Sequence, residues 1–474
     1  MLDDTIAAIA TPLGEGGLAV VRLSGPQALA VADSSFRPAG KKALRPSAAA
    51  THTIHFGRVV RGRETIDEVL LAVLRAPHTF TREDTVEITC HGGLLPAKLV
   101  LDTLLANGAR AAAPGEFTRR AFLNGRIDLA QAEAVADLIH SRTELALAAA
   151  NEQLAGRLSQ RINVLRDEMM QTLAHVEAHI DFPDEDISPA TRDQLLERLD
   201  RGVAFMDELL RTANEGQILR RGIRAAIVGR PNAGKSSLLN QLLGHERAIV
   251  SPIPGTTRDT IEETANVRGL PVVFVDTAGL REAGDEIEQE GVRRSRESLA
   301  RAEFILQVLD ASELLTPADG KYLAEFAGKK RILVLNKADL PRKLVLDPVW
   351  SSAFRRPSAP EPPEGGTPNL PVVDVCCLSG QGIEALKDAI KELVWSGEIT
   401  AGMLQVMINS RHQDALTRAR AATQRTLAVL RGGETLELAA GELRIAVNAV
   451  GEIVGKTTTE DLLDSIFSQF CIGK

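Results

Sequence analysis

A glycine-rich stretch near the middle of the 474-residue chain constrains its fold more than any other feature. The apolar run from Ile223 to Val228 predicts a buried strand, and the residues after it, GRPNAGKS, match G-x-x-x-x-G-K-[ST]. Leucines at helical spacing after Lys235 predict a helix. Glycines in such a loop let backbone N–H groups turn toward a phosphate, and the helix N-terminus adds positive charge. A chance glycine-rich turn is the alternative, but the flanking strand and helix favour a phosphate site.

The loop and two later segments predict how a nucleotide is held. Lys235 is expected to reach the β- and γ-phosphates, and the Ser236 hydroxyl is expected to bind Mg²⁺. The polar loop PGTTRD supplies Thr257 as a second Mg²⁺ ligand, and Asp276, after the strand Pro271 to Val275, holds the Mg²⁺ shell through water. The residues expected to contact the nucleotide here are Asn232, Ala233, Gly234, Lys235, Ser236, Ser237, Ser251, Pro252, Ile253, Pro254, Gly255, Thr256, Thr257, Asp276, Thr277, Ala278 and Gly279.

Two further segments predict which base is bound. The strand Arg331 to Leu335 leads into the sequence NKAD, and a second strand, Val372 to Cys376, leads into a Ser-Gly pair. The carboxylate of Asp339 can accept hydrogen bonds from N1 and N2 of guanine, which adenine does not offer. The predicted base pocket consists of Asn336, Lys337, Ala338, Asp339, Ser379 and Gly380. These motifs in this order predict a GTPase domain.

One position departs from the small regulatory GTPases. Leu280 follows DTAG where those proteins carry a water-orienting glutamine. Because leucine cannot orient water, another group must do so. The acids Asp285, Glu286, Glu288 and Glu290 follow in the same segment, although each is also consistent with a solvated helix start. The sequence shows no obvious arginine finger within the same chain, so another group must neutralise the negative charge of the transition state.

Composition limits the class of protein. A chain of 474 residues is too long for one ordinary core, so two to four domains are expected, and the 3% aromatic content with abundant Leu and Ala favours helices. The longest apolar runs are far short of a membrane span and the N-terminus lacks a leader pattern, so we expect a cytoplasmic protein with no membrane partner. A net charge of −8 gives no global attraction to nucleic acid. Four cysteines without C-x-x-C spacing argue against a zinc site.

The chain divides by pattern into an α/β start and helical flanks around the GTPase domain. Strands are expected at residues 18–23, 69–74 and 85–89, with a helix at 96–105. From Gly115 the pattern is helical. A long helical stripe contains Leu154, Leu158, Ile162, Leu165, Met169, Leu173, Val176 and Ile180. A second helical pattern covers about 191–219, and helices resume at Leu404. We expect an N-terminal α/β domain at 1–118, a helical domain at 119–220 and 399–474, and a Ras-like GTPase domain inserted between them at 221–398.

Three other stretches are assigned no chemistry. The acidic break DFPDED after residue 180 is expected to be a solvated loop, although a metal site is the alternative. The Pro-rich stretch 341–371 is expected to be a flexible surface insertion. Two basic clusters are expected to be solvated helix faces rather than RNA-binding patches: Arg293, Arg294 and Arg296, and Arg411, Arg418, Arg420 and Arg425.

The assembled motifs resemble the bacterial tRNA modification GTPase family MnmE, also called TrmE. The resemblance covers nearly the whole chain and rests on DTIAAIATPLGEGGLAVVRLSG, FTREDTVEITCHGG, PGEFTRRAFLNGRIDLAQAEAVADLI, GRPNAGKSSLLN, PGTTRD, DTAGLRE and the terminal FCIGK. The insertion at 341–371 departs from the family pattern. The base-pocket segment also departs, because it reads Ser-Gly-Gln instead of Ser-Ala-Lys/Arg.

The resemblance implies more than the motifs do. Family members are homodimers with an N-terminal domain similar to folate-binding proteins. Together with the flavin-dependent partner MnmG, with which a heterotetramer is expected, they add an aminomethyl or carboxymethylaminomethyl group at C5 of the wobble uridine (U34) of certain tRNAs. A 5-formyl- or methylene-tetrahydrofolate supplies the carbon unit. The matching folate residues are Arg22, Glu87, Arg126 and Lys474, and Cys471 is expected to line the site.

The resemblance also fills the two gaps left by Leu280. In the family, the GTPase domains dimerise around K⁺, and the matching ligands are Asn232, Ser251, Ile253 and Thr256. The water-orienting glutamate of the family matches Glu288, which makes Glu288 and Lys235 the expected catalytic residues. Two rival functions share these motifs: a ribosome-assembly GTPase and a stand-alone folate enzyme with a regulatory GTPase domain. The first usually carries a basic RNA-binding domain, whereas the residues after Leu404 have mixed charge.

Overall fold

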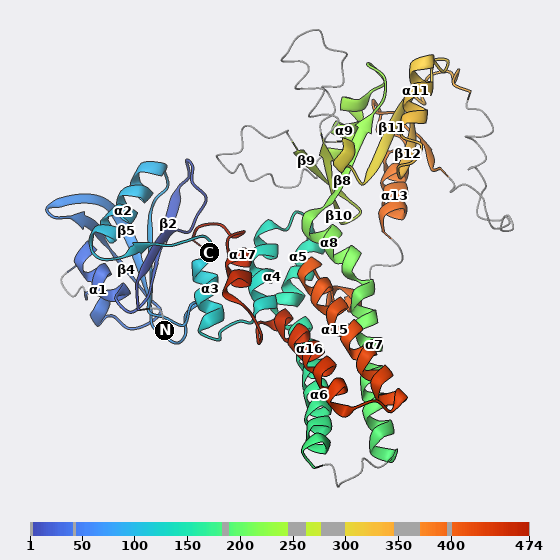
Figure 1. Ribbon diagram of the computed structural model, residues 1–474. Coiled ribbons are helices and arrows are strands. Elements are labelled where there is room, and N and C mark those ends of the chain that lie inside the picture. The colour runs from blue at the N-terminus through green and yellow to red at the C-terminus, as the bar shows by residue number, and fades with distance from the viewer. Residues whose placement is uncertain are drawn as a thin grey trace, which may run out of the picture. The chain divides into compact units, whose positions relative to one another are not determined.

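The computed structural model describes residues 3–40, 44–182, 189–244, 262–275, 299–345, 370–395 and 401–473. The chain divides into two compact units (Figure 1). The first unit comprises Met1–Ile139, Asn151–Leu210 and Ser410–Lys474, and the second comprises His140–Ala150 and Arg211–Asn409. Within the described ranges, none of the helices combines the length and apolar character needed to cross a lipid bilayer. The domain boundaries drawn from the sequence stay predictions.

The first unit begins with a seven-stranded sheet in the order β3-β4-β5-β6-β2-β1-β7. Its strands are β1 (Ile6–Ile9), β2 (Leu18–Ser24), β3 (Phe36–Pro38), β4 (Thr53–Arg61), β5 (Glu64–Leu74), β6 (Thr85–His91) and β7 (Arg110–Ala111). All neighbouring pairs are antiparallel except β1 and β7. Helices α1 (Ala28–Ser35) and α2 (Leu94–Ala106) pack their apolar residues into one core with the sheet. The predicted strands and helix of this region are confirmed.

The open face of this sheet follows from alternation along its strands. In β2, Val21 and Leu23 are fully buried in the core, so Val20 and Arg22 point to the other face. Arg22 is not on an edge strand, because β2 lies between β6 and β1 inside the sheet.

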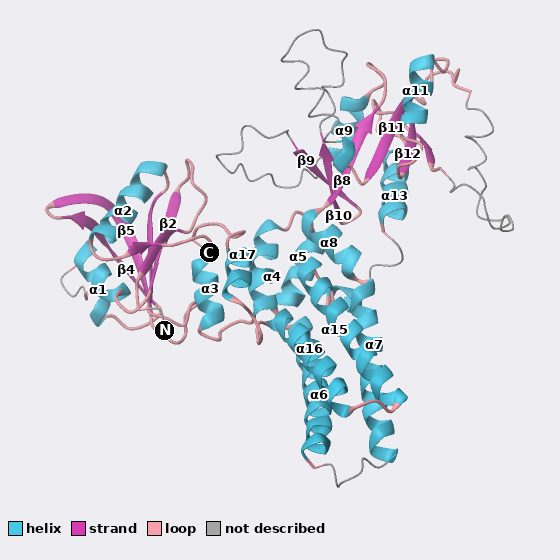
Figure 2. Ribbon diagram, in the orientation of Figure 1, coloured by secondary structure: helices cyan, strands magenta, loops and turns pink. Residues whose placement is uncertain are grey.

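The rest of the first unit is helical (Figure 2). It contains α3 (Glu116–Leu123), α4 (Leu129–His140), α6 (Arg157–Asp181), α7 (Pro189–Arg211), α15 (Ser410–Gly432), α16 (Leu436–Val454) and α17 (Glu460–Phe467), and α5 (Glu144–Leu154) runs across the boundary between the units. A short 3₁₀ turn covers Pro46–Ala48. The apolar stripe of α6 is confirmed, since six of its members are buried: Leu158, Ile162, Leu165, Met169, Leu173 and Val176.

Two helical predictions need correction. Leu154 is the last residue of α5 rather than part of α6, because Gly156 adopts the left-handed conformation (φ 81°) and separates the two helices. The second pattern, at 191–219, is also two helices: α7 ends at Arg211 and α8 (Ala213–Arg221) follows. At the junction, the Thr212 hydroxyl donates to the carbonyl oxygen of Val406 at 3.1 Å.

The basic cluster on α15 is neutralised within the unit. Arg411 pairs with Glu133, Arg418 with Glu452 and Asp414, Arg420 with Asp207, and Arg425 with Glu442. These ion pairs confirm that the cluster belongs to helix faces and leave little free charge for RNA. The other basic cluster, at 293–296, lies outside the described residues.

The second unit contains a six-stranded sheet in the order β13-β12-β11-β8-β10-β9. Its strands are β8 (Ile223–Val228), β9 (Glu262–Val267), β10 (Leu270–Val275), β11 (Phe304–Asp310), β12 (Arg331–Asn336) and β13 (Val372–Asp374), and only β9 is antiparallel to its neighbour. Every residue of β10, β11 and β12 is buried, as expected for apolar strands covered on both faces. The remaining helices are α9 (Lys235–Leu243), α11 (Pro317–Glu325), α13 (Ile383–Val394) and α14 (Ala401–Leu404).

The last strand is shorter than predicted. β13 ends at Asp374, and Cys376 makes only an isolated bridge to Gln381. Gly382 follows with a positive φ of 82°, and a Cβ there would meet the carbonyl oxygen of Asp374 at 2.1 Å. The chain therefore turns sharply after β13. Most of the Pro-rich insertion, residues 346–369, lies outside the described residues.

Candidate functional site

The glycine-rich loop joins β8 to α9 in the predicted way. Gly229 (φ 152°) lies so close to β11 that a Cβ would meet the carbonyl oxygen of Val308 at 2.3 Å. At Gly234 (φ 98°) a Cβ would meet the Asn336 side chain. Gly234 also precedes α9 without any side-chain cap, so the first N–H groups of the helix point into the loop. This is the arrangement that binds phosphate at a helix N-terminus.

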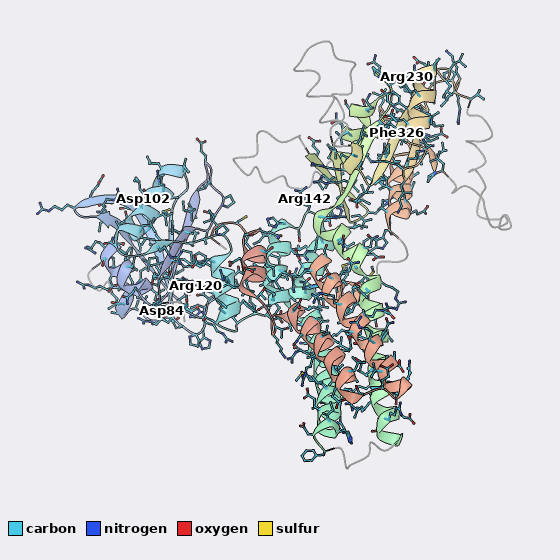
Figure 3. The ribbon with its side chains drawn as sticks, viewed as in Figure 1. Asp84, Asp102, Arg120, Arg142, Arg230 and Phe326 are labelled. Carbon is cyan, nitrogen blue, oxygen red and sulfur yellow. The ribbon has the colours of Figure 1, made fainter. Side chains whose placement is uncertain are left out.

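The cationic side chains of the loop are held in opposite ways. The Lys235 ammonium lies inside the loop and donates to the carbonyl oxygens of Gly229 (2.9 Å) and Arg230 (2.8 Å). Arg230 instead pairs with Asp319 (2.7 Å) and Glu313 (2.9 Å) beside α11 (Figure 3). Of the two cations, Lys235 is therefore the one whose position fits the predicted phosphate contact.

Asn336 joins the three described nucleotide segments. Its Nδ2 donates to the carbonyl oxygen of Ala233 in the phosphate loop at 2.9 Å, and its Oδ1 accepts from the Cys377 N–H at 3.1 Å. The Ala338 N–H donates to the carbonyl oxygen of Val375 at 3.1 Å. The structure thus brings residues 232–237, 336–339 and 379–380 together at the carboxyl ends of parallel strands, where open α/β sheets bind ligands.

Five polar side chains of these segments face solvent. Asn232, Ser236, Ser237, Asp339 and Ser379 are all exposed. Asn232 has a positive φ of 64°. Exposed serine, asparagine and aspartate oxygens are suitable ligands for a hard cation or for the edge of a base.

Much of the predicted site lies outside the described residues. This applies to the whole segment with the second Mg²⁺ ligand, the segment after β10, the catalytic glutamate and the C-terminal lysine. The residues concerned are Ser251, Pro252, Ile253, Pro254, Gly255, Thr256, Thr257, Asp276, Thr277, Ala278, Gly279, Glu288 and Lys474. Their roles stay predictions.

Sequence reasoning missed Asp310, the last residue of β11. Its Oδ2 lies 2.5 Å from Nζ of Lys337, and its Oδ1 accepts from the N–H (3.0 Å) and hydroxyl (2.6 Å) of Ser312. Burial raises the pKa of Asp310, but the hydrogen bonds from Lys337 and Ser312 outweigh that effect and hold it below its ordinary value. The sequence did contain a signal for this residue: Asp310 follows an apolar run and stands two positions before Ser312.

In the first unit, Arg22 and Glu87 form a cross-strand ion pair. The two residues face each other in the register of β2 and β6, and Nε of Arg22 lies 2.8 Å from Oε1 of Glu87. Nη1 of Arg22 donates to the carbonyl oxygen of Gly473 at 3.3 Å, so the C-terminal segment reaches the same point. The guanidinium also lies 5.6 Å from the centre of the Phe117 ring. The structure therefore brings together predicted folate residues that are far apart in sequence.

Arg126 belongs to the same region through aromatic contacts. Its guanidinium lies 5.8 Å from the centre of the Phe80 ring, and Phe80 packs against the apolar cluster that contains Phe117. Arg126 is exposed. Cys471 has an exposed side chain, and its carbonyl oxygen accepts from the Gly115 N–H at 3.4 Å. Two arginines, a carboxylate and aromatic rings thus surround this part of the unit.

A buried ionic network around Arg120 lies in the same unit. Arg120 of α3 is fully buried and pairs with Asp4 (2.7 Å), Glu116 (3.0 Å) and Glu83 (3.2 Å) (Figure 3). Burial raises the pKa of Glu116, but hydrogen bonds from Arg110, from the backbone and from Arg120 outweigh it and lower the pKa below its ordinary value. The network joins α3 to the start of the chain, and sequence reasoning did not find it.

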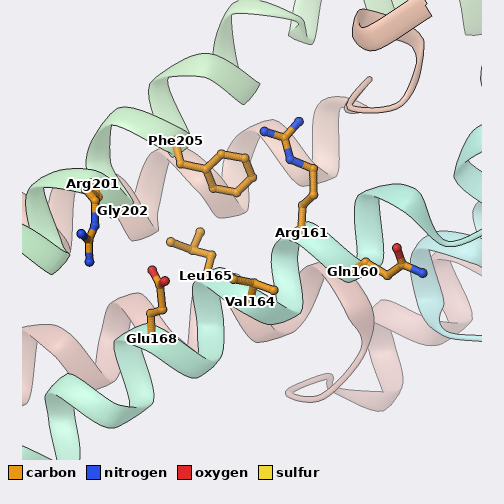
Figure 4. Close-up of a pocket in the computed structure, with 8 residues that line it drawn as sticks. All are labelled: Gln160, Arg161, Val164, Leu165, Glu168, Arg201, Gly202 and Phe205. Carbon is orange, nitrogen blue, oxygen red and sulfur yellow. The ribbon is translucent and has the colours of Figure 1, made fainter.

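A cavity of about 380 Å³ lies between α6 and α7, away from the predicted residues (Figure 4). Its floor is apolar, with Val164, Leu165 and Phe205, and its rim is charged, with Arg161, Glu168 and Arg201. Arg161 lies 4.7 Å from the centre of the Phe205 ring and 3.2 Å from Glu208. Both rim arginines are paired with acids outside the lining, Arg161 with Glu208 and Arg201 with Glu197, so no ligand chemistry is assigned to the cavity.

A mostly parallel sheet with a phosphate loop after β8, and an NKAD segment at the same edge, defines the second unit as a P-loop nucleotide-binding fold. A family model described as the MnmE helical domain matches residues 129–471, and one described as the N-terminus of the GTP-binding protein TrmE matches residues 5–126. The chain belongs to the MnmE (TrmE) family of tRNA modification GTPases.

Two relatives that are themselves tRNA modification GTPases match this chain over nearly their whole length. The tRNA modification GTPase MnmE of Geobacillus kaustophilus (strain HTA426) is 48% identical, with 99% of each chain covered. That of Bacillus subtilis (strain 168) is 45% identical, with 99% of this chain and 100% of the relative covered. Among solved structures, a variant of Era from Aquifex aeolicus bound to GDP and AlF4⁻ is 30% identical over 42% of this chain and 66% of that chain, with a TM-score of 0.28.

Proposed function

We propose that this chain hydrolyses GTP in order to drive modification of tRNA. Together with a flavin-dependent partner such as MnmG, it adds an aminomethyl or carboxymethylaminomethyl group at C5 of the wobble uridine, using a carbon unit from a tetrahydrofolate derivative. The observation that carries the proposal is the joining of the phosphate loop to the base-binding loops through Asn336, in a chain that matches named tRNA modification GTPases over its full length.

In the nucleotide site, each described group has a distinct task. Lys235 neutralises phosphate charge, and the N–H groups at the start of α9 hold the phosphate oxygens. Asp339 accepts from the guanine N1 and N2 donors. Mg²⁺ would be held by Ser236 and Thr257, and K⁺ by Asn232, Ser251, Ile253 and Thr256. Bound there, the cations would neutralise developing negative charge. Glu288 orients the attacking water.

The pairing of Arg22 with Glu87 fits a reduced folate. Such a molecule carries carboxylates on its glutamate tail and N–H donors on its pterin ring, which suit a guanidinium and a carboxylate respectively. Arg126 offers a second cation beside an aromatic ring. The residues that would hold the folate are Arg22, Glu87, Arg126 and Lys474, with Cys471 lining the site.

The open face of the N-terminal sheet supports a homodimer. Leu18, Ile54, Phe56 and Leu70 are between 47% and 70% exposed, and Phe56 faces Leu70 across β4 and β5. Arg22 and Glu87 lie on this same face, because Ala72 pairs with Glu87 and alternates with the buried Leu71 and Val73. Contiguous exposed apolar side chains typically mark a protein interface. A second copy of the chain is the occupant that the family resemblance implies.

The function is tested by mass spectrometry of wobble uridines in tRNA from cells that lack the protein. The expected result is loss of the C5 modification and its return when the full-length chain is supplied. A Lys235→Ala variant, which retains the folate residues, should not restore it. Pull-down of a flavin-containing protein separates this function from a ribosome-assembly GTPase. Unchanged wobble uridines in the deleted strain would refute the proposal.

A further inference from the structure

We propose that Asp310 is a positioning residue for guanine recognition, acting through Lys337. The proposal rests on the proposed binding of GTP and adds a residue that lies outside the nucleotide motifs. Asp310 ends β11, which is the strand beside the one that carries the base-binding loop. Its carboxylate pairs with Lys337, so it acts on the base through that lysine and not by direct contact.

The register of the sheet places the two residues together. Asp310 lies directly opposite Asn336 in the parallel ladder of β11 and β12, so Lys337 begins the loop immediately beyond it. The Asp310 side chain is only 4% exposed, whereas that of Lys337 is 36% exposed. The buried carboxylate of Asp310 therefore holds Lys337, the first residue of the base-binding loop.

Lys337 needs such an anchor because of its backbone. It has a positive φ of 63°, a conformation that residues with a Cβ seldom adopt and that persists only where the surroundings impose it. Asn336 is fixed on one side by Ala233 and Cys377. The Lys337 ammonium is fixed on the other by Asp310. Two anchors at adjacent residues set the direction in which the chain leaves β12 toward Asp339.

The charge of Asp310 is part of its role. One carboxylate oxygen faces the ammonium, and the other accepts both donors of Ser312. An asparagine has the same shape but offers one acceptor oxygen and no charge, so it cannot serve both partners. Asp310→Asn therefore loosens Lys337 with little change in side-chain volume.

The experiment measures nucleotide binding by the full-length Asp310→Asn protein, using a fluorescent mant-GDP probe and competition by GTP and ITP. Affinity for GTP and GDP should fall by the same factor, at least about fivefold, because the two share a base. ITP lacks the guanine 2-amino group, so a displaced Asp339 should also reduce the preference for GTP over ITP. The kcat at saturating GTP should stay the same. A merely structural defect would lower kcat and leave the GTP/ITP ratio unchanged.

Two further variants keep the test decisive. Lys337→Met should weaken binding equally, and the double variant should be no worse than either single one, because both remove one interaction. Asp374→Asn is the control: Asp374 ends the next strand, β13, but is exposed and 3.5 Å from Arg342. It should bind normally. Additive losses, or normal binding and GTP/ITP preference by Asp310→Asn, would overturn the inference. Failure of the wild-type protein to bind mant-GDP would instead refute GTP binding itself.

Discussion

Arg22 is held by three groups, yet its position on the open face of the sheet leaves it available to a ligand. Its side chain is 18% exposed, and that of its partner Glu87 is 31% exposed. We expect Arg22→Ala to weaken binding of 5-formyltetrahydrofolate at least about tenfold, or about 1.4 kcal/mol. GTP hydrolysis should be unchanged, because the GTPase site uses other residues. Calorimetry measures the loss, and full affinity in Arg22→Ala, Glu87→Ala and Arg126→Ala alike would exclude this pocket.

Asp339 is proposed to carry the specificity for guanine. It is exposed in the loop after β12, whose last residue, Asn336, is tied to the phosphate loop. Asp339→Asn should lose GTP and gain xanthosine triphosphate, because the exchanged donor and acceptor now match xanthine. Sites built around such hydrogen bonds discriminate by roughly 10⁴-fold. Competition binding measures the switch, and unchanged GTP affinity would remove the NKAD segment from the base pocket.

Helix α3 depends on charge because it carries the fully buried Arg120, which pairs with three carboxylates. The pKa of Glu116 lies below the ordinary value of 4.5, so folding favours the deprotonated acid. This contribution is fully present above pH 4.5 and is lost as the pH falls through the lower, folded-state pKa. Asp4 acts in the same direction, since hydrogen bonds from Arg110 and Arg120 outweigh burial and lower its pKa.

We therefore expect Glu116→Gln to destabilise α3 at pH 7 by about 1–3 kcal/mol, because it leaves donors of Arg120 without a carboxylate. The variant should also lose less stability on acidification than the wild type does. Hydrogen–deuterium exchange of the α3 amides at pH 7 and pH 4 measures both effects. Glu64→Gln, at an exposed strand position, is the control and should behave as the wild type. Equal acid sensitivity of Glu116→Gln and the wild type would contradict the assignment.

The proposed assembly uses two separate surfaces. On the N-terminal sheet, Phe56 is 54% exposed and stands opposite Leu70. Phe56→Glu places a charge in this apolar patch and should convert a dimer to monomers in sedimentation equilibrium, because burial of an unpaired charge is unfavourable. Phe182→Glu is the control, since Phe182 is also exposed (65%) but follows α6. A Phe56→Glu protein that is still dimeric would place the interface elsewhere.

The second surface is the GTPase unit, where K⁺ is proposed to take the place of an arginine finger. Replacing K⁺ by Na⁺ at equal ionic strength should lower both dimerisation of this unit and GTP turnover.

Glu288→Ala should bind GTP normally but hydrolyse it far more slowly, because orientation of water matters only in the transition state. Single-turnover hydrolysis with parallel binding measurements separates the two effects. Equal rates in the two salts would contradict the role of K⁺, and normal turnover by Glu288→Ala would assign the water to a neighbouring acid.

Local patterns were sufficient to predict several of the described strands and helices, but not β1, β4, β9 or β11. The alternation of β2, the apolar runs of β8 and β12 and the stripe of α6 each record which side of an element is buried, and that information lies within a few neighbouring residues. Patterns failed where one residue interrupts them, as at Gly156 between α5 and α6, because leucines continue at helical spacing across the break.

Pairings between distant residues depended on the topology. Arg22 meets Gly473 across 451 positions of sequence, Arg120 meets Asp4 across 116, and Asp310 meets Lys337 because β11 and β12 are adjacent and in register. Charged residues fit many local contexts, so their types and spacing do not specify a partner. The chain order of the strands in each sheet selects that partner, since it determines which loop ends lie side by side.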